Sequence, residues 1–399
     1  MQQSKKICVV GLGYIGLPTA ALLANCGYKV HGVDVTQSTV DTINNGNIHI
    51  VEPGLDAFVS SAVSSGRLHA DTKPVKADIF IIAVPTPFHE GYVPNIDYIA
   101  SATKAIAPYV KEGDIIILES TSPVGTTDKV EEFLKEEGVD TSKLYIAYCP
   151  ERVLPGRIMI ELVENDRIVG GITPEATKVT VEFYNTFVEG AVLSTDAKTA
   201  EMTKLTENSF RDTNIAFANE LSILCDKFDI NVWELITLAN RHPRVNILQP
   251  GAGVGGHCIA VDPWFIVHAG GEDAKMIRTA REVNTYKAEW TIEKIKNSAL
   301  KFENENGRKA KIACMGLSFK PDIDDLRESP ALYITKRLMT EGLDILAVEP
   351  NISKHKEFKV YDYNEAIKDA DIVTFLVAHK EFKDLDVEIE LDFCGVSNK

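Results

Sequence analysis

The first half of the chain alternates short apolar runs with amphipathic helical patterns. Strand patterns lie at residues 6–10, 30–35, 79–84, 115–118 and 144–148, and the last three are continuous apolar runs. Runs of this kind are typical of parallel strands that are buried on both faces. Because helical patterns separate them, the sequence predicts strand–helix repeats and therefore an α/β fold with an N-terminal Rossmann domain.

From about residue 196 the pattern changes to long helices. Residues 197–228 read as one helix of over thirty residues, and further helical patterns cover 231–239 and 274–301. Such a helix is longer than most in globular domains and needs packing partners along its length. We expect it to join two domains and to offer an apolar surface to a second subunit, so a homodimer is predicted.

A polar stretch at residues 301–308 is the expected linker to a second, smaller α/β unit. Apolar runs at 311–317, 344–348 and 371–377 predict its strands. The predicted domains are therefore a Rossmann domain at 1–195, a central helical region for dimerisation and the catalytic loop at 196–300, and a smaller Rossmann-like domain at 301–399.

A glycine fingerprint follows the first predicted strand. Its spacing is G-x-G-x-x-G, a helical pattern comes next, and Asp34 stands near the end of the second strand, as dinucleotide binding requires. Asp34 accepts hydrogen bonds from ribose hydroxyls and repels a 2′-phosphate, so NAD is favoured over NADP. The alternative is a glycine-rich turn in some other α/β protein. The expected cofactor contacts in the turn are Gly11, Gly13, Tyr14, Ile15 and Gly16.

Polar loops follow the later strands and are expected to line one crevice at their carboxyl ends. Pro85 and Thr86 follow one strand, Thr121 another, and Glu151 with Arg152 a third. Thr121 and Glu151 are the groups suited to position water or move a proton. Alternatively, Thr121 bonds only to loop backbone and Glu151 pairs with Arg152.

Cys258 stands in a loop that contains three glycines, among them Gly255, and Asp262 follows four residues later. Glycine lets main chain approach a neighbour closely, and a nucleophilic thiol commonly needs a second group within hydrogen-bond reach. Cys258 is therefore the candidate nucleophile. A small buried hydrophobic residue is the alternative, since that is the commonest role of a single cysteine.

Several cations and one amide complete the candidate site. Lys204 and Asn208 are spaced i, i+4 and so share one face of the long helix, although an ordinary exposed pair has the same spacing. Arg244 precedes the cysteine loop, while Lys320 and Arg327 follow the first strand of the C-terminal unit. The latter two offer charges to a phosphate-bearing ligand, or belong to a solvated acidic face.

Composition narrows the function class. The formal net charge of −16 argues against nucleic-acid partners and an anionic membrane surface, since both require a basic field. The N-terminus lacks a signal-peptide pattern and no apolar run approaches the length of a membrane span. Seven cysteines, an odd number, fit reduced cytoplasmic thiols. The histidines show no metal-ligand spacing with cysteine, so no metal is expected.

Taken together, these segments resemble the UDP-glucose/GDP-mannose dehydrogenase family along essentially the whole chain. The matching motifs are residues 11–16 with Asp34, 120–125, Pro150 with Glu151, Lys204 with Asn208, 255–258 with Asp262, and 319–322 with 327–329. Pro155 stands where the UDP-glucose branch usually has a second Glu. That departure, with the segments around Arg152, Arg211 and Trp264, favours UDP-N-acetyl-D-mannosamine over UDP-glucose. UDP-N-acetyl-D-glucosamine, its C2 epimer, stays an alternative.

The resemblance implies oxidation of a sugar C6 alcohol to a carboxylate with two NAD, for surface polysaccharide biosynthesis. It assigns thiohemiacetal and thioester formation to Cys258, oxyanion stabilisation to Lys204 and Asn208, and water activation to Thr121, Glu151 and Asp262. It places Lys320 and Arg327 on the UDP and cofactor side. A two-electron hydroxyacid dehydrogenase and a non-catalytic NAD-binding protein are the rivals; neither needs Cys258, Lys204 and Asn208 together.

Overall fold

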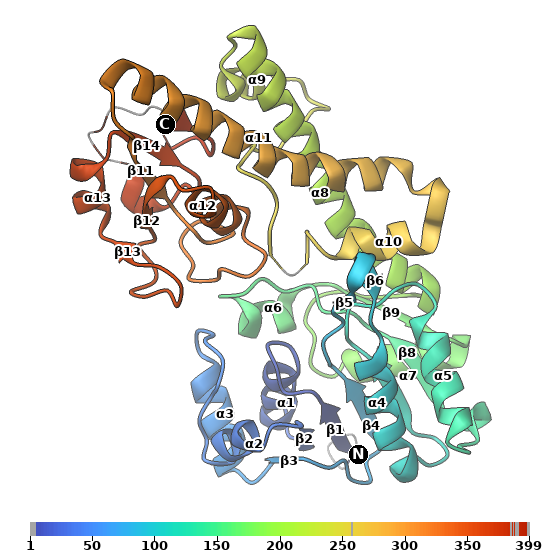
Figure 1. The fold of residues 1–399 in the computed structure, drawn as a ribbon. Helices are drawn as coiled ribbons and strands as arrows, with labels where there is room; N and C mark the ends of the chain where they lie inside the picture. Colours follow the sequence, from blue (N-terminus) through green and yellow to red (C-terminus); the bar gives the residue numbers. More distant parts are fainter. Residues whose placement is uncertain (1–4, 257, 384, 386, 388–390, 397–399) are drawn as a thin grey trace. The chain divides into compact units, whose positions relative to one another are not determined.

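The computed structural model describes residues 5–256, 258–383, 385, 387 and 391–396. It divides into two compact units, Met1–Thr206 and Glu207–Lys399, and the boundary falls inside helix α8 (Ala197–Phe228) (Figure 1). The bounds of α8 agree with the predicted helix. The prediction of three domains stays a prediction.

Within its described residues, the first unit is built on an eight-stranded sheet of order β10-β9-β8-β7-β4-β1-β2-β3. All neighbours in it are parallel except β8 and β9, which are antiparallel. The strands are β1 (Lys6–Val10), β2 (Lys29–Val33), β3 (Leu68–Asp71), β4 (Ile79–Ile82), β7 (Ile115–Leu118), β8 (Tyr145–Tyr148), β9 (Arg167–Gly171) and β10 (Val192–Asp196). A short hairpin adds β5 (Phe88–His89) and β6 (Val93–Pro94). The predicted Rossmann architecture is confirmed.

Helices cover both faces of this sheet, and the alternation along each strand decides which side chain meets which layer. On one face, Ile7 and Ile79 pack with apolar residues of α1, α3, α6 and α7. On the other, Cys8 and Phe80 pack with α4, α5 and Ala200 of α8. The helices are α1 (Gly16–Asn25), α2 (Gln37–Asn44), α3 (Leu55–Ser64), α4 (Asp97–Ile106), α5 (Thr126–Glu136), α6 (Ile158–Glu164) and α7 (Pro174–Tyr184).

The second unit combines long helices with a smaller parallel sheet of order β13-β12-β11-β14-β15. Its strands are β11 (Lys311–Met315), β12 (Asp344–Val348), β13 (Val360–Tyr361), β14 (Ile372–Phe375) and β15 (Leu391–Asp392). Its helices, besides α8, are α9 (Val232–Ala239), α10 (Asp262–Gly270), α11 (Lys275–Asn306), α12 (Pro330–Thr340) and α13 (Tyr363–Asp369). Helices α11 and α12 pack on one face of the sheet, and α13 packs on the other. The smaller Rossmann-like domain is also confirmed.

The predicted linker is wrong over most of its length. Helix α11 continues to Asn306 and ends at Gly307, which has a left-handed backbone. Phe302 packs against the core of the second unit, so the polar residues around it lie on the solvent face of a helix. Glycine after the last turn is the usual signal that ends a helix, and here Gly307 ends α11.

A buried polar network fixes α8 against α11. Arg281 donates to Asp212 at 2.7 Å, and the Asn284 amide donates to the same carboxylate at 2.8 Å. Asn219 donates to the Asn284 side-chain oxygen and accepts from the backbone N–H of Gly251. Burial raises the pKa of Asp212, although Arg281 opposes the shift. This network holds the segment leading to the Cys258 loop on the two long helices.

Candidate functional site

The first glycine turn has the geometry that a dinucleotide requires. Gly11 has φ +93° and its N–H donates to the Val33 carbonyl at 2.8 Å. A Cβ at Gly11 would come within 2.5 Å of the Ala83 carbonyl oxygen, and one at Gly16 would collide with Gly11. No other residue type fits these two positions. They fold the chain back over the ends of β1 and β2 and begin α1.

Gly13 and Asp34 leave room for the cofactor. A Cβ at Gly13 would meet nothing within 4 Å, so the main chain there is open to a ligand. Asp34 accepts hydrogen bonds from the Leu12 N–H at 3.2 Å and the Thr36 N–H at 2.9 Å. A carboxylate has about four acceptor sites, so Asp34 keeps capacity for ribose hydroxyls. Tyr14 is exposed and Ile15 is the N-cap of α1. These residues fit a bound NAD.

The loops after β4 and β7 are joined by hydrogen bonds. The Thr86 hydroxyl donates to the Thr121 carbonyl at 2.5 Å, and the Ser120 hydroxyl donates to the Val84 carbonyl at 2.6 Å. The structure therefore brings Pro85, Thr86 and Thr121 together at the carboxyl ends of two neighbouring strands. This is the crevice position expected of parallel sheets.

Glu151 is buried, and its carboxylate forms an ion pair with the Arg167 guanidinium. Arg167, at the start of β9, is also buried and donates to the Leu162 carbonyl at 3.0 Å. The backbone N–H of Arg152 donates to Glu151 at 3.1 Å, while its guanidinium donates to the Asp166 carbonyl. Arg167 was missed because its role depends on a fold contact that the sequence does not display.

A second buried carboxyl lies in the same charged cluster. Glu119, directly after β7, accepts from the hydroxyls of Tyr184 at 3.2 Å and Thr19 at 3.4 Å. Burial and the neighbouring Glu151 raise the pKa of Glu119, and Arg167 only partly opposes this. The raised pKa favours the protonated form of Glu119 beside the Glu151–Arg167 ion pair.

Helix α8 carries Lys204 and Asn208, and Glu201 attaches its start to the Thr121 loop. The buried Glu201 carboxylate accepts from the N–H groups of Gly125 at 2.5 Å and Thr127 at 2.7 Å. Lys204 is half-buried one turn later. Glu201 was also missed, since a carboxylate on a long helix usually faces solvent.

Cys258 is exposed, and the glycines before it serve close packing within the second unit. A Cβ at Gly256, where φ is +84°, would come within 2.8 Å of the Phe319 ring. Gly255 lies equally tightly against Glu328 and Pro330. The structure thus brings the Cys258 loop beside the loop that carries Lys320. His257 lies outside the described residues.

Asp262 and Asn208 form a hydrogen-bonded pair one turn from Cys258. The Asp262 N–H donates to the Cys258 carbonyl at 2.8 Å, which begins α10. The buried Asp262 carboxylate accepts from the Asn208 amide at 2.5 Å. The nucleophile loop is therefore tied to α8 through the two residues that sequence spacing had selected.

The remaining predicted cations are exposed. Arg244 follows α9, and its N–H donates to the His242 ring. Arg327 forms a bidentate pair with Asp325, with atom separations of 2.6–3.0 Å. Lys320 lies in the exposed loop after β11. Arg327 therefore has the acidic surroundings that the sequence offered as an alternative, and Asp325 partly neutralises its charge.

The C-terminal unit repeats the first turn with one change. The Gly316 N–H donates to the Val348 carbonyl at 2.9 Å, as Gly11 does to Val33. The acid after the second strand is now Glu349, which is buried and accepts from the N–H groups of Leu317 and Ser318. Hydrogen bonds to the carboxylate lower the pKa of Glu349 to about 2 despite its burial. Because its acceptor sites are already used, Glu349 lacks the spare acceptor capacity that Asp34 keeps.

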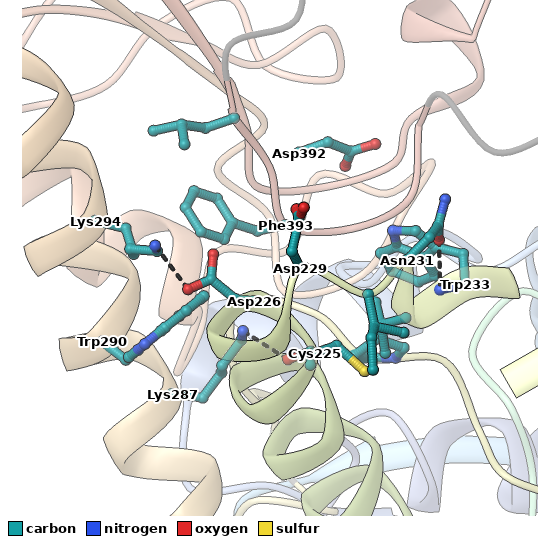
Figure 2. A pocket seen from close by; sticks show the side chains of 15 residues that line it. Cys225, Asp226, Asp229, Asn231, Trp233, Lys287, Trp290, Lys294, Asp392 and Phe393 are labelled. Atoms are coloured by element: carbon teal, nitrogen blue, oxygen red, sulfur yellow. Dashed lines mark hydrogen bonds and ion pairs between the residues drawn. The ribbon is translucent and has the colours of Figure 1, made fainter. Parts of the chain in front are cut away.

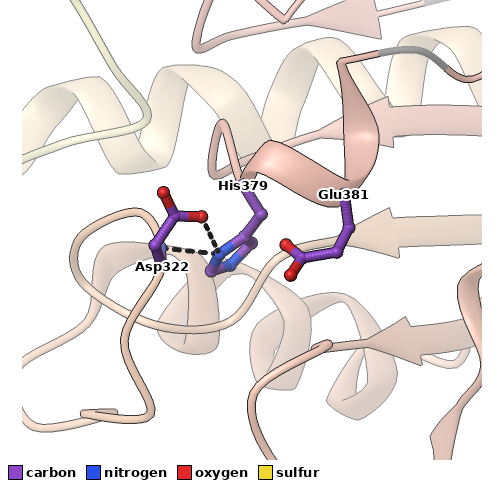
Figure 3. Close-up of side chains that lie close together, drawn as sticks. All are labelled: Asp322, His379 and Glu381. Atoms are coloured by element: carbon purple, nitrogen blue, oxygen red, sulfur yellow. Dashed lines mark hydrogen bonds and ion pairs between the residues drawn. The ribbon is translucent and has the colours of Figure 1, made fainter.

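Figure 3 shows a cluster of Asp322, His379 and Glu381 whose side-chain atoms lie within 4.8 Å of one another. The Nδ1 of His379 already accepts from the Asp322 N–H at 2.9 Å, and its Nε2 lies 3.0 Å from Glu349. The ring therefore has no lone pair to offer a cation. We interpret the cluster as a hydrogen-bonded support for the loop that follows Lys320.

Three family models match the chain in order. They are the NAD binding domain (residues 5–188), the central domain (198–286) and the UDP binding domain (313–392) of the UDP-glucose/GDP-mannose dehydrogenase family. The chain belongs to the UDP-glucose/GDP-mannose dehydrogenase family. NAD is its cofactor, and it is an oxidoreductase that acts on nucleotide sugars.

Individual relatives narrow the comparison. The UDP-N-acetyl-D-mannosamine dehydrogenase of Campylobacter jejuni is 57% identical, covering 99% of this chain and 100% of the relative. An NDP-N-acetyl-D-galactosaminuronic acid dehydrogenase of Ralstonia nicotianae is 53% identical, covering 96% and 93%. The solved UDP-D-ManNAc dehydrogenase of Pyrococcus horikoshii is 36% identical, with a TM-score of 0.90 and coverage of 98% and 96%. Among the described residues, no helix is both long and apolar enough to span a membrane.

Proposed function

We propose that the chain is a UDP-N-acetyl-D-mannosamine 6-dehydrogenase. It oxidises the C6 alcohol to a carboxylate in two steps, consuming two NAD and one water and yielding two NADH. The observation that carries the proposal is the exposed Cys258 thiol, one turn from the Asn208–Asp262 pair. The relatives support this substrate, because the Campylobacter jejuni UDP-N-acetyl-D-mannosamine dehydrogenase matches this chain over its full length.

In the proposed first oxidation, C6 loses a hydride to NAD and its hydroxyl loses a proton, which gives an aldehyde. The Cys258 thiolate then attacks the aldehyde carbon and forms a thiohemiacetal. Loss of a second hydride and a proton converts this adduct to a thioester. The sulfur retains the aldehyde carbon throughout, so release of free aldehyde is avoided.

Lys204 and Asn208 are proposed to donate to the substrate oxygen as negative charge develops on it. Asn208 already gives one amide hydrogen to Asp262, and an amide has two. The bond to Asp262 fixes the direction of the second N–H. Preorganised donors of this kind stabilise an oxyanion most strongly where water is excluded.

Hydrolysis of the thioester completes the reaction. Thr121, Glu151 and Asp262 are proposed to hold the attacking water and to take its proton. Arg167 fixes Glu151 in one orientation, which suits a group that orients water. The thiolate is the leaving group and is ready for the next cycle.

The remaining contacts are assigned by likeness to the family. NAD is proposed to bind at the first glycine turn with Pro85, Thr86, Thr121 and Arg327, and the UDP-sugar with Arg152, Arg244, Gly255 and Lys320. Arg327 must loosen its pairing with Asp325 to reach a phosphate. An Arg side chain suits phosphate because its fork donates two parallel hydrogen bonds.

Parallel assays with four UDP-sugars test the substrate. We expect kcat/KM for UDP-N-acetyl-D-mannosamine to exceed the values for UDP-N-acetyl-D-glucosamine, UDP-N-acetyl-D-galactosamine and UDP-glucose. A misplaced hydroxyl leaves buried polar groups of the site without hydrogen-bond partners. Each unpaired group costs about 1–3 kcal/mol, so the total cost is several kcal/mol. Equal or higher kcat/KM with any of the other three would overturn the choice of sugar while leaving the chemistry intact.

We further propose a cytoplasmic homodimer that supplies a uronate for surface polysaccharide. Phe210, Phe217, Leu224 and Phe228 are 67%, 54%, 40% and 62% exposed on α8. Their spacing of seven, seven and four residues makes one stripe, and the 100° rotation per residue puts Lys204 and Asn208 on the opposite side of the helix. A second copy of the chain is the proposed cover for this stripe.

A further inference from the structure

A cavity of about 530 Å³ lies in the second unit, between the end of α8, the start of α9, α11 and β15. Its walls combine the aromatic rings of Trp233, Trp290 and Phe393 with charged side chains. Figure 2 shows Lys287 and Trp290 projecting from α11 toward Cys225 and Asp226 of α8. The proposed oxidation makes no use of these residues.

Lys287 is the unusual group in this cavity. Its side chain is buried, and Nζ donates to the Ser222 hydroxyl at 2.8 Å and lies 3.8 Å from the centre of the Trp290 ring. Among the described residues, no carboxylate forms an ion pair with it, and the nearby Asp226 pairs with Lys294 at 2.7 Å. A buried ammonium with only a hydroxyl and ring faces for company is costly.

The surroundings favour the neutral amine. Burial lowers the pKa of Lys287 to about 7, Lys294 adds to the effect, and Asp226 opposes it. Asp229 beyond α8, the Cys225 thiol, and Asp392 on β15 are the other titratable groups that line the cavity. A lysine that is desolvated and beside a second cation is the usual form of a nucleophilic amine.

We propose that Lys287 is a reactive amine in this cavity, and that it takes up small uncharged aldehydes or ketones as an imine. The nitrogen lone pair attacks the carbonyl carbon, and the nitrogen loses its protons as the carbonyl oxygen leaves as water. One C=N bond replaces the C=O bond, with no oxidation or reduction. The cavity supplies room for the carbonyl compound beside Nζ.

The lining selects against anionic reagents. Asp226, Asp229 and Asp392 surround the cavity, and the faces of Trp290 and Phe393 carry partial negative charge. A carbamate from carbon dioxide, or an imine from a keto acid, would add a carboxylate to these surroundings. A neutral imine adds none, so an uncharged carbonyl compound is the class that the site fits.

Reductive trapping on the whole protein tests the proposal. Propanal and cyanoborohydride are added at pH 7, and labelled lysines are identified by peptide mass spectrometry. We expect Lys287 to be labelled at least about tenfold faster than the exposed Lys301. Glyoxylate under the same conditions should label Lys287 more slowly than propanal does. Labelling of Lys287 no faster than Lys301, or preference for glyoxylate, would overturn the proposal.

Lys294→Met provides a matched variant. It removes the neighbouring cation and leaves Asp226 without its partner, and both changes favour the Lys287 ammonium. Labelling of Lys287 at pH 7 should fall severalfold and recover at higher pH. A labelling rate independent of Lys294 and of pH would show that the cavity does not activate the amine. Both experiments use forms of the protein that retain Lys287.

Discussion

Asp34 is expected to hold the backbone of the glycine turn and to select NAD over NADP, and a single substitution separates these two roles. It holds the Leu12 and Thr36 N–H groups and is proposed to exclude a 2′-phosphate. Asp34→Asn keeps an acceptor for the turn but removes the charge. We expect the preference for NAD over NADP to narrow roughly tenfold. A factor of ten corresponds to about 1.4 kcal/mol, which is close to the contribution of one hydrogen bond to a charged group.

The ratio of kcat/KM for the two cofactors is the measurement. Asp41→Asn is the control, because Asp41 lies on α2, the helix after Asp34, and its carboxylate accepts from the Gln37 amide. An unchanged ratio in Asp34→Asn, or equal use of both cofactors by the unaltered protein, would contradict the role.

Lys287 should also affect stability in a pH-dependent way. Its pKa is about 7 when folded against a usual 10.5, so between these values the unfolded chain binds more protons. Folding therefore becomes more favourable as the pH rises through this window, and the cost of burying the ammonium is complete below pH 7. Lys287→Met removes that cost.

Thermal unfolding measures this effect. We predict that Tm of Lys287→Met, relative to the unaltered protein, is higher at pH 6 than at pH 9 by roughly 2–4 °C or more. Lys301→Met, at an exposed position of α11, should show no such difference between the two pH values. The prediction fails if the Lys287→Met difference is the same at both.

At the scale of residues, the sequence predicted what depends on local spacing. Gly11, Gly16 and Asp34 were recognisable because a turn between two strands imposes their order. Arg167 and Glu201 were not, because their partners lie 16 and about 75 residues away and become neighbours only in the folded sheet. Burying such charges is unfavourable without partners, and no local pattern records the partner.

At the scale of elements, the exposed apolar stripe on α8 (Phe210, Phe217, Leu224 and Phe228) gives the clearest reason to expect a dimer. Phe217, at its centre, should lie in the proposed dimer interface, so Phe217→Asp should raise the dissociation constant of the dimer by roughly thirtyfold or more. Sedimentation velocity at micromolar concentration measures the outcome. Tyr98→Asp, at an exposed aromatic residue on α4, should leave the dimer intact. A monomeric unaltered protein would refute the interface.

Prediction of elements succeeded where the hydrophobic pattern was strong and failed where packing outweighed composition. The bounds of β1, β7, β12 and α8 match their apolar patterns. The end of α11 was missed because Glu and Asn suggested a linker while Phe302 anchored a helix. Strand β9 was missed because it begins with a buried Arg and ends in two glycines.

At the scale of the whole molecule, the same type of strand–turn unit occurs in both α/β sheets, but the acidic residue after the second strand has different partners in each. Gly11 with Asp34 and Gly316 with Glu349 are equivalent in backbone hydrogen bonding. Only Asp34 retains acceptor capacity, because Leu317, Ser318 and His379 donate to one oxygen of Glu349 and Asn351 donates to the other. The turn after β11 also lacks the second and third glycines of the fingerprint, so its sequence and the occupied acceptor sites of Glu349 both argue against a second NAD site there.

Cys258→Ser separates binding from chemistry. In the proposed mechanism the sulfur acts only after the first hydride transfer, so the affinity of the variant for nucleotide sugar and NAD should change little. Turnover should fall by roughly a thousandfold or more, because a hydroxyl is a poor nucleophile at neutral pH and its ester is hydrolysed less readily than a thioester. Mass spectrometry should detect a slowly hydrolysing adduct or traces of aldehyde. A variant with unaltered kcat would return Cys258 to a packing role.

The most direct measurement is the number of NADH formed per UDP-sugar consumed by the unaltered enzyme. NADH is followed by absorbance, the uronate is quantified by chromatography, and a hydrazine reagent is present to trap aldehyde. We predict two NADH for each uronate and no trapped aldehyde, because Cys258 is proposed to hold the intermediate between the two oxidations. One NADH per sugar, with the aldehyde recovered as its hydrazone, would contradict four-electron oxidation through Cys258.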